Sequence, residues 1–132
     1  MLLRVFVVLA LPILTASLTY AEDRTDADYD VVVYGGTSSG AVAAIQTANM
    51  GRSVVLIEPS QHVGGLTSGG LGATDIGNKA AIGGLSREFY RRVRRWYEDE
   101  AHWTREKQSD YQSSRQQGKE DTMWTFEPHV AE

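Results

Sequence analysis

The 132-residue sequence contains no cysteine, only three prolines and only three histidines. Without cysteine, the chain has no disulfide, no thiol for redox exchange and no cysteine to carry a lipid anchor. The longest apolar run, from Val5 to about Leu18, is shorter than the ~20 residues that span a membrane, and Pro12 interrupts it. No spacing of histidines and carboxylates resembles a metal site, and no Gly-x-Ser-x-Gly nucleophile elbow or Ser/His/Asp arrangement can be argued.

Basic residues are too few to indicate a nucleic-acid partner. Thirteen Lys and Arg residues stand against seventeen Asp and Glu residues, a formal net charge of -4. A local exception is the arginine cluster of Arg87, Arg91, Arg92, Arg94 and Arg95. Glu88 and the acids at 98–100 offer partners at helical spacing, which favours a solvated helix face over a patch for an anionic substrate.

The first 29 residues form a region of their own. Residues 1–21 have one basic residue, Arg4, then an apolar stretch and a small-x-small end at Ala21, which is typical of a secretory signal peptide. We therefore expect export to a periplasmic or extracellular location, with no membrane span after cleavage; an uncleaved anchor is the alternative. Residues 22–29 are predicted to be a flexible leader.

The stretch from Asp30 to Glu58 has the order of a dinucleotide-binding βαβ unit. Residues 31–34 are a β-branched run suited to a parallel strand, residues 41–48 form a small-residue helix that Gly51 ends, and residues 53–57 form a second strand. Glu58 follows Gly40 at about the spacing, ~20 residues, at which an acidic side chain meets ribose hydroxyls.

The turn between strand and helix predicts a pyrophosphate site. Helix N-termini offer unpaired N–H groups and a partial positive charge. Gly35 and Gly40 occupy the first and last glycine positions of the G-x-G-x-x-G fingerprint, whereas Thr37 replaces the middle glycine. The hydroxyls of Thr37, Ser38 and Ser39 are further hydrogen-bond donors.

A second glycine-rich stretch runs from Gly64 to Gly84 and is unsuited to a helix or strand interior. From Asp30 to Glu132 the sequence resembles the N-terminal part of the FAD-dependent oxidoreductase family. The segments that carry the resemblance are GGTSSGAVAAIQTANMGRSVVLIEPSQHVGGLTSGGLGATD, GGLSREFYRRV and FEPHVAE. The likeness is closest to a bacterial branch with threonine in place of the middle glycine.

The resemblance implies FAD as cofactor and a set of residues that hold it. It implies a pyrophosphate cradle of Gly35, Gly36, Thr37, Ser38, Ser39 and Gly40, a ribose contact at Glu58, and a segment toward the flavin ring of Gly64, Gly65, Leu66 and Thr67. NAD is the rival ligand for the βαβ unit alone, but the glycine pairs after Glu58 favour FAD. The lack of cysteine excludes a cysteinyl–flavin bond within this chain. His62 is either a flavin contact or an ordinary loop residue.

The remaining residues predict helix and loop. Residues 84–107 are predicted to form a helix, capped by Ser86, whose apolar face carries Leu85, Phe89, Val93 and either Trp96 or Tyr97. Residues 107–121 read as an exposed loop, residues 122–126 as a short extended piece, and Pro128 as a helix entrance.

These predictions combine into an α/β fold: a Rossmann-like βαβ start of a parallel sheet, incomplete in this chain, with residues 30–132 as the N-terminal part of an FAD-binding domain. Only two sheet strands are predicted, so we expect a longer protein, an exported flavoprotein oxidoreductase acting on an unknown small molecule, whose catalytic residues lie elsewhere. The alternatives are a truncated non-catalytic nucleotide-binding remnant and an NAD-dependent reductase.

Overall fold

A computed structural model describes residues 27–116 and 118–132. The signal peptide predicted at 1–21 and the leader residues up to 26 lie outside this range. Residues 27–29 are irregular and exposed. Within the described range no helix has the length and apolar character needed to cross a bilayer.

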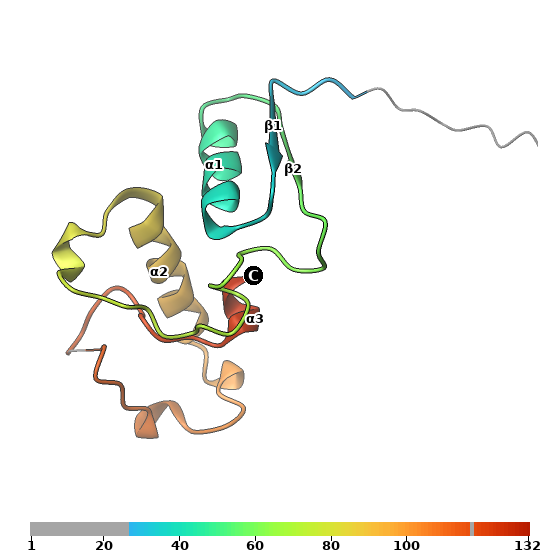
Figure 1. Ribbon diagram of the computed structural model, residues 1–132. Helices are drawn as coiled ribbons and strands as arrows, with labels where there is room; N and C mark the ends of the chain where they lie inside the picture. Colours follow the sequence, from blue (N-terminus) through green and yellow to red (C-terminus); the bar gives the residue numbers. More distant parts are fainter. Residues whose placement is uncertain (1–26, 117) are drawn as a thin grey trace, which may run out of the picture.

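The βαβ unit is present as predicted (Figure 1). Strand β1 (Val31–Tyr34) is followed by helix α1 (Ser38–Asn49) and strand β2 (Val54–Ile57). The strands pair in parallel, with Val31 opposite Val54 and Tyr34 opposite Ile57. The second strand begins one residue later than predicted, because Ser53 instead binds the Asp30 carboxylate through both its amide and its hydroxyl.

Helix α1 covers one face of this two-stranded sheet, whereas the other face is open. A β-carbon added at Gly40 of α1 would lie 3.5 Å from a Val33 methyl group, so helix and strand are in close contact there. Val32 is 60 % exposed and Tyr34 76 % exposed. The β-branched run therefore predicted the strand correctly, but its second face is not buried within this part of the chain.

A second layer is built on helix α2 (Gly84–Trp96). Val93, Tyr97, Met123 and Phe126 form its buried core, and Phe89 packs against them. The predicted apolar face is confirmed, with Tyr97 rather than Trp96 as its last member, because Tyr97 is 5 % exposed and Trp96 43 %.

The prediction of one helix over residues 84–107 is wrong: α2 ends at Trp96. Its last carbonyls accept from the tight turn at Glu98 and Asp99 and from side chains that fold back, and the helix does not continue. His102 Nδ1 lies 2.6 Å from the Trp96 carbonyl, and Trp103 Nε1 donates to the Tyr97 carbonyl at 2.8 Å. Two 3-10 turns follow, η2 (Glu100–His102) and η3 (Gln108–Asp110).

The predicted cap at Ser86 is also wrong. The N-cap of α2 is Gly83, which has no side chain to bond the helix, and Gly84 has a φ of +56°. The left-handed backbone at Gly84 begins the helix three residues earlier than a serine cap at position 86 would.

The chain then returns beneath α2. The Thr74 amide donates to the Trp124 carbonyl at 3.1 Å, and the Phe126 amide donates to the Gly72 carbonyl at 2.8 Å. Ala73 and Thr125 form a single antiparallel bridge, so the predicted extended piece lies against the glycine-rich stretch without becoming a strand. The 3-10 turn η1 (Lys79–Ala81) and helix α3 (Pro128–Ala131) complete the elements; Pro128 opens α3 as predicted.

The arginine cluster is a solvated helix face. Glu88 pairs with Arg92 and Arg95 at 3.1 and 2.9 Å, and Asp121 pairs with Arg87 and Arg91 at 2.9 and 2.8 Å. Hydrogen bonds from these arginines hold the pKa of Glu88 and of Asp121 below their ordinary values. The second arginine partner, Asp121, comes from a segment about 30 residues away and was not predicted.

Candidate functional site

The two glycine-rich segments meet beside the N-terminus of α1. The Gly64 amide donates to the Gly36 carbonyl at 2.6 Å, and Thr37 and Gly64 form a parallel bridge. The Gly35 amide donates to the Ile57 carbonyl at 2.8 Å, which carries the sheet one residue beyond β1. In Figure 1 the segment after β2 accordingly passes directly beneath the start of α1. The predicted pyrophosphate cradle and the segment predicted to lead to the flavin thus form one site.

Three glycines of the site disfavour a side chain for different reasons: Gly40 faces backbone, Gly36 faces the Glu58 side chain, and Gly65 has a left-handed backbone. A β-carbon on Gly40 would lie 2.0 Å from the Gly35 carbonyl oxygen, and one on Gly36 would lie 2.9 Å from Glu58 Oε2. Gly65 has a φ of +57°, and a β-carbon there would lie 3.4 Å from Thr37 Cα. Gly40 and Gly65 thus let backbone segments approach each other, and Gly36 leaves room for the Glu58 carboxylate.

Thr37 is the N-cap of α1, which explains how this chain does without the middle glycine. Its Oγ1 accepts from the Gly40 amide at 3.2 Å, and its carbonyl accepts from the Ala41 amide at 2.9 Å. The amides of Ser38 and Ser39, the first two of the helix, donate to no group in the described part of the chain. Ser38 and Ser39 are exposed residues, so the helix start presents two amides without a partner among the described residues and the positive end of its dipole.

Ser38 joins the helix start to the second segment. Its hydroxyl donates to the Gly64 carbonyl at 2.7 Å and lies 2.7 Å from Thr67 Oγ1. Because a serine hydroxyl has one proton, Thr67 is then the donor in the second bond. This Ser38–Gly64–Thr67 clasp brings together three predicted site residues across up to 29 positions of sequence.

Glu58 lies at the end of β2 and faces the same turn. Its Oε1 accepts from the Ser60 amide at 2.7 Å and its Oε2 from the Gly36 amide at 2.5 Å. Hydrogen bonds from Ser60 and from Gly36 lower the pKa of Glu58, so it is ionised at neutral pH. A carboxylate has about four lone-pair positions, so roughly two are left for the vicinal hydroxyls of a ribose.

Ser60, which was not predicted from the sequence, binds the Glu58 carboxylate through its amide. The Pro59–Ser60 pair directly after Glu58 was the available signal, since such pairs form turns that return an amide to a preceding acidic side chain. The turn fixes the Glu58 carboxylate before any ligand binds.

Two other candidates stand apart from this geometry. Leu66 is 74 % exposed, and among the described residues its hydrogen bonding is limited to its carbonyl, which accepts from the Leu71 amide at 3.2 Å. His62 Nδ1 lies 3.0 Å from Glu132 Oε2, and the Val63 amide donates to Glu132 Oε1 at 3.1 Å. His62 therefore connects the second segment to α3, and its predicted role toward flavin remains a prediction.

The geometry fits a dinucleotide. The free Ser38 and Ser39 amides suit the pyrophosphate, Glu58 suits the adenosine ribose, and the glycines leave room for close approach. The described residues contain no group of three or more histidines or carboxylates that would hold a metal ion.

Comparison with known proteins agrees with this geometry. The model of the family "FAD dependent oxidoreductase" matches residues 30–132. A 3-oxosteroid 1-dehydrogenase from Mycolicibacterium smegmatis is 43 % identical over 58 residues, which are 44 % of this chain and 10 % of that enzyme. The match thus spans about a tenth of the relative's length, and no solved structure matches. The family match decides for FAD over NAD: this chain belongs to the FAD-dependent oxidoreductase family.

Proposed function

We propose that this chain is the N-terminal, FAD-binding part of an exported oxidoreductase. The observation that carries the proposal is the meeting of the free α1 amides, the Glu58 carboxylate and the Gly64–Thr67 segment at one end of the sheet. Each of these groups suits a different portion of FAD, and each comes from a different segment of the chain.

FAD supplies the redox chemistry when bound, and the protein supplies binding and orientation. The Ser38 and Ser39 amides neutralise phosphate charge at the positive end of α1. Glu58 orients the adenosine ribose, and its own position is set by Ser60 and Gly36. The clasp holds the second segment against the helix start, so that the cradle is formed before the cofactor arrives.

A larger protein around this site is part of the proposal. The sheet face bearing Val32, Tyr34 and Ile57 is apolar, and these side chains are 60 %, 76 % and 44 % exposed. Monomeric proteins rarely leave such a face open, and β1 also has one unpaired edge. Further strands and a substrate-binding part would cover both and would carry the catalytic residues.

The test is an absorption spectrum of the chain from Glu22 onward, recorded after incubation with FAD and desalting. Retained flavin absorbance with a shifted band supports an FAD site within these residues. A folded chain, judged by circular dichroism, that retains no flavin contradicts the proposal and favours the non-catalytic remnant. NAD added in place of FAD is the matched control, because the same βαβ unit would hold either dinucleotide.

Export is tested separately. The proposal rests on the signal-like pattern of residues 1–21. Expression of the complete chain in a bacterial host should give a mature product that begins near Glu22 outside the cytoplasm. A product that retains Met1 and stays in the cytoplasm refutes export without affecting the FAD assignment.

A further inference from the structure

Glu132, which follows α3, binds the residues that lead into the second glycine-rich segment. Its Oε1 accepts from the Val63 amide at 3.1 Å, and its Oε2 lies 3.0 Å from His62 Nδ1. In Figure 1 the C-terminal end of the chain accordingly lies beside the segment that follows β2. One carboxylate thus connects the strand-bearing half of the molecule to the layer built on α2, across 69 positions of sequence.

The bond to Val63 is one residue away from the clasp. The Val63 carbonyl accepts from Ser68 Oγ at 2.5 Å, and the Gly64 amide donates to the Gly36 carbonyl at 2.6 Å. That carbonyl and that amide belong to one planar peptide unit, so the two bonds fix its orientation together. The bond from the Val63 amide to Glu132 fixes the chain immediately before this unit.

Helix α3 gives the Glu132 carboxylate a defined position. Val130 and Ala131 pack against the buried core beneath α2. At the other end of α3, the Glu127 amide donates to Tyr97 Oη at 3.0 Å, and Tyr97 is a buried member of that core. The carboxylate is therefore held by the α2 layer and not by the loop that it binds.

The two bonds of Glu132 differ in weight. Hydrogen bonds from His62 and from the Val63 amide hold the pKa of Glu132 below its ordinary value, so the carboxylate is ionised at neutral pH and its bonds are charge-assisted. The His62 side chain is 72 % exposed, and exposed ion pairs contribute little. The bond to the Val63 amide is therefore the one that we expect to matter for the fold of the segment.

We propose that Glu132 is a positioning residue for the cofactor. By holding the Val63 amide, it keeps the Gly64 amide on the Gly36 carbonyl and the clasp closed beside the first amides of α1. The inference rests on the proposed FAD function. It adds that the α2 layer, through α3, sets the geometry of a cradle with which it shares no residue.

The test combines two measurements on the full 132-residue chain: FAD binding, followed by quenching of flavin fluorescence, and hydrogen exchange of the Gly64 amide without FAD, followed by NMR. Glu132→Ala should weaken FAD binding and speed Gly64 exchange, each by about threefold to tenfold, the value of one hydrogen bond. Glu132→Gln keeps an oxygen for the Val63 amide and should restore most of both losses. His62→Ala should change each by less than about twofold.

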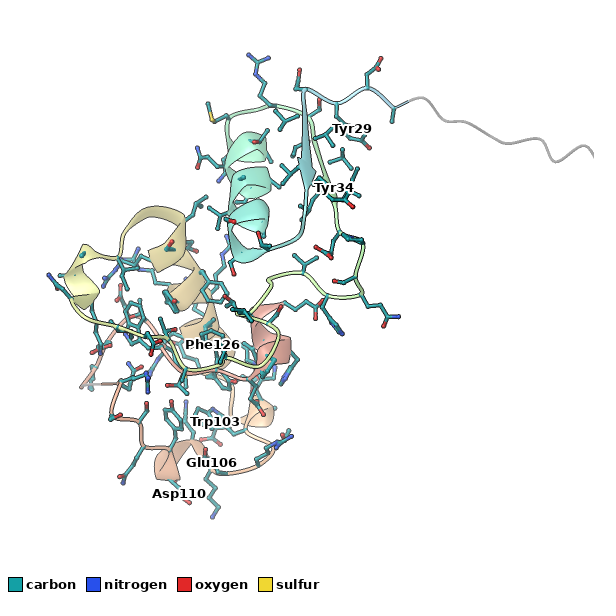
Figure 2. The ribbon with its side chains drawn as sticks, viewed as in Figure 1. Tyr29, Tyr34, Trp103, Glu106, Asp110 and Phe126 are labelled. Atoms are coloured by element: carbon teal, nitrogen blue, oxygen red, sulfur yellow. The ribbon has the colours of Figure 1, made fainter. Side chains whose placement is uncertain are left out.

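Glu106→Ala is the matched control, because it removes an exposed carboxylate far from the site. Figure 2 shows Glu106 in the half of the molecule remote from Tyr34 and the strands, so this variant should change neither measurement. The inference is overturned if Glu132→Ala leaves FAD binding or Gly64 exchange unchanged, if Glu132→Gln restores nothing, or if His62→Ala costs as much as Glu132→Ala. Failure of the original chain to retain FAD contradicts the proposed function instead, and the exchange measurement then still decides whether Glu132 orders the segment.

Discussion

Gly40→Ala tests the geometry of the cradle with the smallest change available, one methyl group. The added β-carbon would lie 2.0 Å from the Gly35 carbonyl oxygen and 3.2 Å from its carbon. Contacts below 3.0 Å are essentially absent for real β-carbons, so helix and turn must separate by at least about 1 Å. Both contacting atoms belong to the backbone, so no side-chain rotation relieves the overlap.

Two opposing energies decide whether Gly40→Ala raises or lowers the free energy of unfolding. Alanine inside an exposed helix is favoured over glycine by about 1 kcal/mol. Overpacking of a rigid contact costs about 1–3 kcal/mol. A shift of about 1 Å also takes the Ser38 and Ser39 amides out of hydrogen-bonding range of a phosphate. Losing one or two charge-assisted bonds of about 1.5–3 kcal/mol each weakens FAD binding by at least about tenfold to a hundredfold.

The assay is a titration of the chain with FAD, followed by quenching of flavin fluorescence, with thermal unfolding measured in parallel. Gly77→Ala is the matched control, because a β-carbon there meets nothing within 4 Å. The reasoning is refuted if Gly40→Ala is more stable than the original chain and binds FAD equally well. That outcome would mean that helix propensity prevails and that the close approach is not required.

Three further changes probe the other parts of the site. The pKa of Glu58 is lowered from 4.5 in the folded chain, so its stabilising contribution is complete above about pH 4.5 and is lost as pH falls through the lower folded pKa. The NMR resonance of the Gly36 amide should therefore titrate with a midpoint below pH 4.5. Glu58→Gln should abolish that titration. Ser38→Ala opens the clasp and should lower the free energy of unfolding by about 0.5–1 kcal/mol and weaken FAD binding, whereas Ser86→Ala, at a helix start without a side-chain cap bond, should change neither. Thr37→Ala should cost about 1 kcal/mol of unfolding free energy and Thr37→Gly only a few tenths, measured by denaturant titration; equal losses would contradict the capping role.

The βαβ unit was predictable because its signals are local. A β-branched run, a glycine turn, a small-residue helix and a second apolar run each specify their own conformation, and β2 differs from its prediction by one residue. The helix over residues 84–107 was not predictable in length. Helical spacing continues to Trp96 or Tyr97, but the stop comes from His102 and Trp103, which fold back onto the last carbonyls. The spacing of apolar residues therefore does not predict where α2 ends.

The sequence by itself determined the order of the elements, the glycines that allow close approach and the carboxylate at the end of β2. These depend on backbone freedom and on spacing within one supersecondary unit. Only the tertiary structure decided that Ser38 closes on Gly64 and Thr67, and that Tyr97, Trp103 and Tyr111 line one cavity. The reason is physical. These contacts join residues that follow no regular spacing along the chain, so they form only when packing has brought the segments together.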